Sequence, residues 1–265
     1  MVVGIVVASK NYHDIFSVTA LLGFLTGFFL TSYSMISNDI YDLEVDKVNQ
    51  PTRPLPSGAV KLQSAKYASL LLLALGLLVS VPLGIANFII ALIFAVLVWY
   101  YNYQGKRFGL IGNSLVSLSL AIPYIYGSIA IGYYGLNLGY LLALTSFLAG
   151  MGREVLKGIA DVKGDVQRKI RTLAISRGIK FSRVTVAAFF LLAVASSALP
   201  VLSGLLGKSL LVYSVLICIP DGIFLFLTVR VLLMKNESES LRLKSIALVG
   251  MMSGLLAYFI AGILG

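Results

Sequence analysis

Two groups of acidic residues, far apart in the chain, have the types and spacing of a metal-binding site. The first group closes a long apolar segment and contains Asn38, Asp39, Asp42 and Asp46. At helical pitch the three aspartates lie at i, i+3 and i+7, and Asn38 stacks on Asp42 at i+4. We therefore expect their oxygens to converge on one face. Hard oxygen donors in this arrangement suit Mg²⁺, which usually binds through a few carboxylates plus substrate phosphate.

A basic residue follows this first group within a short distance. Arg53 lies in a proline-rich turn, written PTRPLPSG, that ends at Gly58. An arginine guanidinium can bind two phosphate oxygens at once. The stretch as a whole predicts a metal-bridged diphosphate site at a membrane surface.

The second group lies more than one hundred residues later and has a different pattern. Arg153, Lys157, Asp161 and Asp165 are spaced by four, so they form one stripe along a helix. Taken alone, Lys157 and Asp161 are equally consistent with a surface ion pair of little energetic value. Two acidic groups, each at the end of an apolar segment and each flanked by basic residues, indicate a shared site more strongly.

The charges of such a pair of groups suggest a chemistry. Carboxylates alone repel a diphosphate ester, whereas Mg²⁺ ions would reverse the local sign and stabilise the diphosphate as it leaves. The candidate ligands and catalytic residues are Asp39, Asp42, Asp161 and Asp165, with Asn38 and Asp46 as further metal ligands. The candidate phosphate-binding cations are Arg53, Lys106, Arg153 and Lys157.

An allylic isoprenoid diphosphate would leave a delocalised carbocation behind. Aromatic faces stabilise such a cation, and the candidates are Tyr33, Tyr41, Tyr101 and Tyr124. Tyr101 and Lys106 belong to an aromatic and basic patch that is equally typical of an interfacial belt at a membrane surface. An apolar cavity would hold the isoprenoid tail and exclude the water that quenches the cation.

The elements that position these residues are predicted to be transmembrane helices. The 265 residues are 58% hydrophobic and only 12% charged, which is typical of a multi-span membrane protein. We expect an all-α bundle of about nine helices, at ~20 residues each, around a central cavity in a single domain, residues 1–265. The expected spans are 15–37, 61–82, 86–101, 111–131, 138–160, 181–206, 210–234 and 246–264, preceded by a truncated first helix at 1–8.

The distribution of basic residues predicts the orientation of the bundle. The net charge of +10 is concentrated in alternate loops, which argues for the positive-inside rule and against nucleic-acid binding. The basic loops follow the second, fourth, sixth and eighth spans, so both acidic groups are expected on the cytoplasmic side of the cell membrane. No obligatory protein partner is evident.

One carboxylate falls inside a predicted span. Asp221 follows Pro220 within 210–234. An intramembrane carboxylate is a candidate functional residue. The alternative, which we favour, is that Asp221 caps a helix that breaks at Pro220.

The first acidic stretch resembles a known family signature. NDIYDLEVDKVNQPTRPLPSG is similar to the N-D-x-x-D-x-x-x-D motif, with its R-P-x-P-S-G tail, of the UbiA-type intramembrane prenyltransferase superfamily. DVKGD, from Asp161 to Asp165, matches the second aspartate motif of that superfamily. The run from Arg153 to Asp165 most resembles the archaeal digeranylgeranylglyceryl phosphate synthases. The family's first helix normally begins further upstream than this chain does.

The resemblance implies a fold, an activity and a cofactor. It implies nine helices with a central cavity, Mg²⁺ dependence, geranylgeranyl diphosphate as donor and geranylgeranylglyceryl phosphate, a lipid phosphate, as acceptor in archaeal ether-lipid synthesis. By position, the metal and diphosphate residues would be Asn38, Asp39, Asp42, Asp161 and Asp165, with Asp46 completing the motif. Lys106 falls where the family has a basic residue.

Three other functions remain open on the sequence. A related enzyme could use an aromatic or chlorophyllide-like acceptor, whereas the run of Arg168, Lys169 and Arg171 would suit an acceptor phosphate or an ordinary cytoplasmic loop. A membrane phosphotransferase would carry a D-G-x-x-A-R pattern, which is missing after Asp42. An ion-coupled transporter would place its carboxylates near the bilayer midplane rather than at helix ends.

Overall fold

Helices supply the regular secondary structure of the computed structural model, which describes residues 1–105, 108–167, 170–234, 236 and 239–265. Within these residues there is no β-strand, and the one β-bridge joins Phe108 to Arg171. The prediction of an all-α fold is confirmed.

Seven helical segments of the described chain are long and apolar enough to cross a membrane. They are α2 (Val18–Tyr41), α4 (Leu62–Ser80) with η2 (Val81–Leu83), α5 (Ile85–Tyr103), α6 (Gly109–Ala130), α10 (Ile179–Ser197) with α11 (Leu199–Leu202), η4 (Gly207–Ser209) with α12 (Leu210–Leu233), and α13 (Glu239–Leu264). The chain is thus a multi-pass membrane protein. The expected count of about nine also included α7 (Leu138–Ala160), a helix of 23 residues that is not among the seven, and α1 (Val2–Ser9), which has 8 residues.

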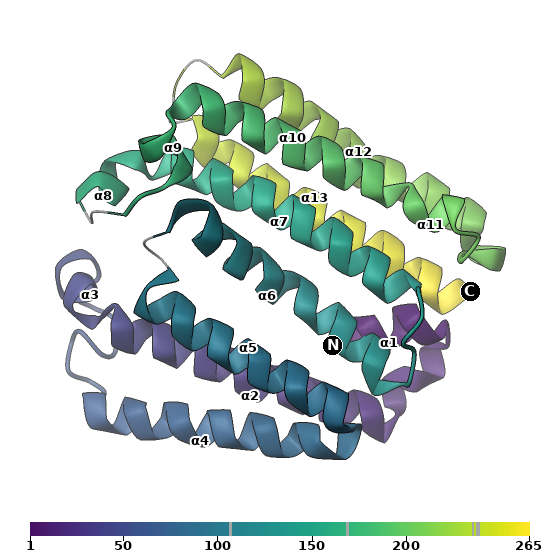
Figure 1. Cartoon of the computed structure of the whole chain (residues 1–265), viewed down its shortest axis with the longest axis horizontal. Helices are drawn as coiled ribbons and strands as arrows, with labels where there is room; N and C mark the ends of the chain where they lie inside the picture. Colours follow the sequence, from purple (N-terminus) through teal and green to yellow (C-terminus); the bar gives the residue numbers. More distant parts are fainter. Residues whose placement is uncertain (106–107, 168–169, 235, 237–238) are drawn as a thin grey trace.

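The helices form two packed groups (Figure 1). In the first half of the chain, α2 packs against α4 and α5. In the second half, α7, α10, α12 and α13 pack together around an apolar core that includes Leu156, Phe190 and Leu227. Helix α6 packs on both α5 and α7 and so connects the two groups.

Both acidic stretches lie at the same end of the bundle (Figure 1). The first continues from α2 into the short helix α3 (Leu43–Asn49), and the second continues from α7 into α8 (Val162–Gln167). A further short helix, α9 (Leu173–Ser176), also lies at this end. The two halves touch there, because the amide of Gly109 donates a 2.9 Å hydrogen bond to the carbonyl of Arg171. The fold therefore brings the two sequence motifs to one side of the protein.

Helix α1 lies at the opposite end and is packed inside the protein (Figure 1). Ile5, Val6 and Val7 have no exposed surface, and α1 contacts α6, α7 and α13. The backbones of α1 and α6 approach so closely that a methyl group on Gly4 would lie 2.7 Å from the carbonyl oxygen of Tyr124. Small residues allow this close approach between membrane helices. The connection to α2 runs through the short helix η1 (Tyr12–Phe16).

Helix α12 runs through Pro220 without a break, from Leu210 to Leu233. The prediction that Asp221 caps a helix broken at this proline is therefore wrong. Instead, Asp221 reaches α10, where its two carboxylate oxygens lie 2.8 and 3.0 Å from the hydroxyl of Ser197. A proline is tolerated inside a membrane helix where neighbouring helices and polar side chains satisfy the backbone groups that it leaves without a hydrogen bond.

Candidate active site

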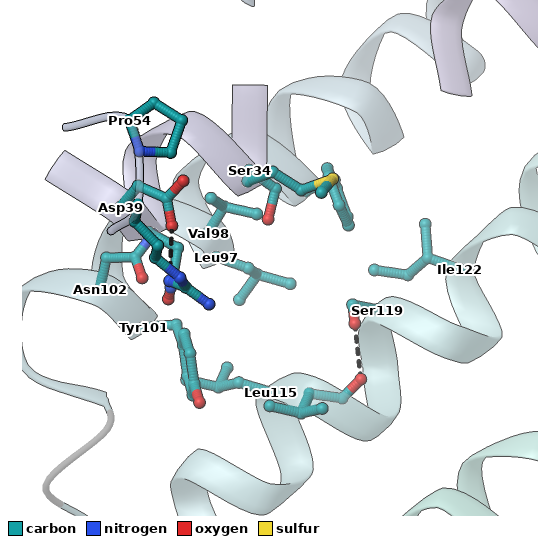
Figure 2. Close-up of a pocket in the computed structure, with 15 residues that line it drawn as sticks. Ser34, Asp39, Pro54, Leu97, Val98, Tyr101, Asn102, Leu115, Ser119 and Ile122 are labelled. Atoms are coloured by element: carbon teal, nitrogen blue, oxygen red, sulfur yellow. Dashed lines mark hydrogen bonds and ion pairs between the residues drawn. The ribbon is translucent and has the colours of Figure 1, made fainter. Parts of the chain in front are cut away.

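A cavity of about 560 Å³ opens between α2, α5 and α6, beside the proline-rich turn (Figure 2). Its wall is mostly apolar, and its polar groups include the side chains of the first acidic motif. The lining residues are Ser34, Met35, Asn38, Asp39, Arg53, Pro54, Phe94, Leu97, Val98, Tyr101, Asn102, Leu115, Val116, Ser119 and Ile122. The predicted cavity is present, but it is walled by helices of the first half alone.

The first motif sits where α2 gives way to α3. Helix α2 ends at Tyr41, and Asp42 adopts φ −91° and ψ 2° before α3 begins at Leu43. The side-chain nitrogen Nδ2 of Asn38 donates a 3.0 Å hydrogen bond to the carboxylate oxygen Oδ2 of Asp42. The predicted stacking of Asn38 on Asp42 is therefore confirmed, and it fixes the direction of both side chains.

Arg53 joins two carboxylates of the first motif. Its Nη1 donates to Oδ2 of Asp46 at 2.8 Å and to Oδ1 of Asp39 at 3.2 Å. The Asp46 side chain is only 10% exposed, whereas that of Asp39 is 44% exposed. Arg53 thus reaches the site as predicted, but in this structure its partners are carboxylates.

Asp39 and Asp46 both contact one nitrogen of Arg53, but Asp39, Asp42 and Asp46 do not form a metal-binding group of three. Among the described residues, no three acidic, histidine or cysteine side chains lie together as a metal centre. The physical reason is local, because the helix changes at Asp42 and the buried Asp46 is occupied by Arg53. Asp39, on α2, is left at the cavity wall.

The second motif lies at the end of α7. Asp161 follows the last residue of that helix, and Asp165 lies in α8. Lys157 does not pair with Asp161, since its Nζ lies 3.7 Å from the buried carboxylate of Glu154. Arg153 also contacts Glu154, at 2.9 Å. Glu154 therefore contacts two of the four predicted phosphate-binding cations, Arg153 and Lys157, and neither of these two lines the cavity.

Tyr101 lies between the two motifs. Its ring lines the cavity near the end of α5, and its hydroxyl is within electrostatic range of Asp42, Glu154 and Asp165. These carboxylates come from both halves of the chain. Of the aromatic candidates, Tyr101 alone lines the described cavity, whereas Tyr33 is buried and Tyr41 is exposed elsewhere.

Several expected cations fall beyond the part of the chain that can be described. Lys106, Arg168 and Lys169 lie outside the described residues. Arg171 is described and is exposed at the end of the bundle that carries both motifs.

The structure also shows residues that the sequence patterns did not single out. Asn102, Ser34 and Ser119 line the cavity, and Glu154 anchors the second motif. Asn102 is one of the two asparagines on a helix that is mainly apolar and aromatic, and it follows Tyr101 in the last turn. That placement was the available signal for it. Nothing in the spacing distinguished Ser34 and Ser119 from other small residues in membrane helices.

Comparison with known proteins identifies the family. Residues 1–261 match the UbiA prenyltransferase family. The chain belongs to this family. Membership favours prenyl transfer over the phosphotransferase and transporter alternatives, and it confirms the resemblance carried by the two aspartate motifs.

Archaeal proteins are among the relatives of this UbiA-family chain. A digeranylgeranylglyceryl phosphate synthase of Archaeoglobus fulgidus is 34% identical over 98% of this chain and 88% of its own length. A protein of the same name from Pyrococcus furiosus is 38% identical over 77% of this chain and 72% of its own length. For the one from Sulfolobus acidocaldarius, identity is 39%, and the match spans 64% of this chain and 61% of that relative's length.

Solved structures share the fold. A structure from work on digeranylgeranylglyceryl phosphate synthase in membranes superposes with a TM-score of 0.85 at 33% identity, covering 98% of this chain and 91% of that one. A UbiA homologue from Archaeoglobus fulgidus bound to GPP and Mg²⁺ superposes with a TM-score of 0.69 at 16% identity, covering 97% and 95%. The second match concerns the fold alone.

Proposed function

We propose that this UbiA-family prenyltransferase transfers a geranylgeranyl group from geranylgeranyl diphosphate to geranylgeranylglyceryl phosphate, a step of archaeal ether-lipid synthesis. The observation that carries the proposal is the cavity, which is apolar along α5 and α6 and ends at Asn38, Asp39 and Arg53. An apolar chamber with a charged rim matches a lipid diphosphate, which has a long hydrocarbon tail and an anionic head. The named archaeal relatives support the choice of donor and acceptor.

Asn38 and Asp39, the two candidate metal ligands that line the cavity, fit a divalent cation together with acidic residues from the rest of the two motifs. Mg²⁺ is commonly bound through one or two carboxylates plus substrate phosphates and water, so a cluster of three acids is not required. Asp39 and Asp42 supply carboxylates on the first motif, and Asp161 and Asp165 supply them on the second. Bound there, Mg²⁺ would neutralise the diphosphate and stabilise its charge during departure.

The cations of the chain take complementary parts. Arg53 sits at the cavity wall with its Nη1 toward Asp39, so it is placed to donate to a phosphate oxygen when the donor enters. The buried carboxylate of Asp46 holds that guanidinium in position. Arg153 and Lys157, anchored by Glu154, provide positive charge beside the second motif.

The cavity wall protects the reaction from water. Phe94, Leu97 and Ile122 supply apolar surface along the path of the isoprenoid tail. Tyr101 lies where tail and head meet, and its ring face can stabilise an allylic cation by cation–π attraction. Exclusion of water then allows the acceptor oxygen, rather than water, to capture the cation.

The orientation in the membrane follows from the charges. The end that carries α3, α8 and α9 is rich in basic residues, including Lys47 in α3, Arg53 in the turn after α3 and Arg171 just before α9. We place this end in the cytoplasm by the positive-inside rule.

The proposal is tested with purified protein in detergent and labelled geranylgeranyl diphosphate. The acceptors are geranylgeranylglyceryl phosphate, an aromatic acid and buffer alone. We expect product with the glyceryl phosphate ether only, its loss in EDTA and its return on adding Mg²⁺. Transfer to the aromatic acid instead, or transfer unaffected by EDTA, would contradict the proposal.

A further inference from the structure

Asn102 is a buried polar residue that faces the first acidic motif from another helix. It lies in the last turn of α5, is 8% exposed, and lines the same cavity as Asn38, Asp39 and Arg53. Figure 2 shows Asn102 on the same side of the cavity as Asp39. Helices α2 and α5 pack against each other, so this relation is built into the fold.

The carbonyl oxygen of this amide lacks a partner. Within the described part of the chain, Oδ1 of Asn102 is buried and accepts no hydrogen bond. Leaving a buried acceptor unsatisfied costs about 1–3 kcal/mol. A bound ion or an ordered water is a common explanation of such a group in a native protein.

The first motif itself needs more oxygen ligands. Asp46 is occupied by Arg53, and no three acidic, histidine or cysteine side chains of the described chain form a metal centre. A cation beside Asp39 and Asp42 would have room for neutral oxygens in its coordination sphere, beside the carboxylates of the second motif, substrate phosphate and water. Asparagine carbonyls are ordinary ligands of hard divalent cations.

We infer that Asn102 Oδ1 belongs to the coordination sphere of the divalent cation at the first motif, either as a direct ligand or through one metal-bound water. The inference rests on the proposed function for the presence of that cation. It extends the metal site from α2 onto α5, so that ion binding would also fix the cavity wall that carries Tyr101.

Asn87 provides a matched control on the same helix. It is 1% exposed and its Oδ1 is also without a partner among the described residues, while its amide nitrogen donates to the carbonyl of Tyr126 at 2.9 Å. Asn87 does not line the cavity. A general cost of replacing a buried asparagine in α5 should therefore appear at both positions, and an effect on metal binding only at Asn102.

The experiment titrates Mn²⁺ into purified protein in detergent and follows the free ion by electron paramagnetic resonance, with and without inorganic diphosphate. We expect Asn102→Leu to weaken Mn²⁺ binding roughly tenfold already without diphosphate, as loss of a supporting group does at other metal sites. Asn102→Asp should bind Mn²⁺ at least as tightly as the parent, and Asn87→Leu should bind it equally well. If Asn102→Leu does not fold, the Asn102→Asp result decides.

Three results would overturn the inference. Unchanged Mn²⁺ binding in Asn102→Leu would do so, and so would weaker binding in Asn102→Asp. If Asn102→Leu weakened Mn²⁺ binding only in the presence of diphosphate, the Asn102 amide would be a hydrogen-bond donor to the diphosphate and not a part of the metal site. A parent protein that binds Mn²⁺ without prenyl transfer would refute the proposed function alone, whereas a parent that binds no Mn²⁺ under either condition would refute both.

Discussion

The guanidinium of Arg53 donates to the carboxylate of Asp46 at 2.8 Å, and the Asp46 side chain is only 10% exposed. The two residues are seven apart, and Arg53 lies in the proline-rich turn that follows α3. The contact fixes the turn over the mouth of the cavity. We therefore expect Asp46 to position Arg53.

Asp46→Asn should therefore weaken donor binding more than metal binding. The neutral amide keeps the shape but holds Arg53 less firmly, so we expect KM for geranylgeranyl diphosphate to rise about tenfold, or ~1.4 kcal/mol. The Mg²⁺ concentration that gives half-maximal rate should stay the same. Steady-state kinetics at varied donor and Mg²⁺ concentrations separate the two.

Arg53→Lys should also raise KM for the donor, because an ammonium lacks the planar fork with which a guanidinium can bind two phosphate oxygens. If Asp46→Asn instead raises the Mg²⁺ requirement and leaves KM for the donor alone, Asp46 is a metal ligand and the positioning role is refuted.

The close contact between α1 and α6 gives a prediction for stability. A Cβ on Gly4 would lie 2.7 Å from the carbonyl oxygen of Tyr124, and one on Gly127 would lie 2.6 Å from the amide nitrogen of Ile5. Gly4→Ala and Gly127→Ala should each destabilise the protein by about 1–3 kcal/mol, as overpacking does. Thermal unfolding in detergent measures the change.

Gly135→Ala is the control, because a Cβ there meets nothing within 4 Å. Its unfolding temperature should match that of the parent. Equal unfolding temperatures for all three variants would show that the two helices can move apart without cost.

Asp221 is predicted to support the fold and not the reaction. Its contact with Ser197 joins α12 to α10, far along the chain from either aspartate motif. Asp221→Ala should lower stability by about 1 kcal/mol, the usual size of such contacts between membrane helices. The rate of prenyl transfer per folded molecule should not change.

Ser214→Ala is a matched change on the same helix, because the Ser214 hydroxyl donates to the carbonyl of Leu210 one turn earlier and not to another helix. It should be neutral in both assays. A large loss of turnover in Asp221→Ala, with unchanged unfolding temperature, would place Asp221 in the mechanism instead.

Much of the fold could be predicted from the lengths of the apolar segments and from helical spacing. Apolar segments of membrane length predicted the long helices, and α7 was predicted with the bounds it has, Leu138–Ala160. The i, i+4 contact of Asn38 with Asp42 also followed from helix geometry, because both residues belong to one turn.

The site was harder to predict where contacts depend on tertiary structure. The pairing of Arg53 with Asp46 depends on how a turn folds back, and the role of Asn102 depends on α5 packing against α2. Asp221 was misassigned because a proline inside a long apolar segment does not show whether neighbouring helices keep the helix intact. Glu154 was not predicted as a site residue because its role depends on its burial and on its contacts with Arg153 and Lys157.

The central claim is that the two aspartate motifs serve one cation-dependent diphosphate site. The most direct test measures binding of a non-hydrolysable geranylgeranyl diphosphate analogue, with and without Mg²⁺, in Asp39→Asn and Asp161→Asn. The control is Glu44→Gln, whose carboxylate lies in the same acidic stretch but is 81% exposed and paired with Lys47. We predict that each aspartate variant stays folded and loses the Mg²⁺-dependent part of binding, while the control keeps it. Full Mg²⁺-dependent binding in either aspartate variant would contradict a shared site.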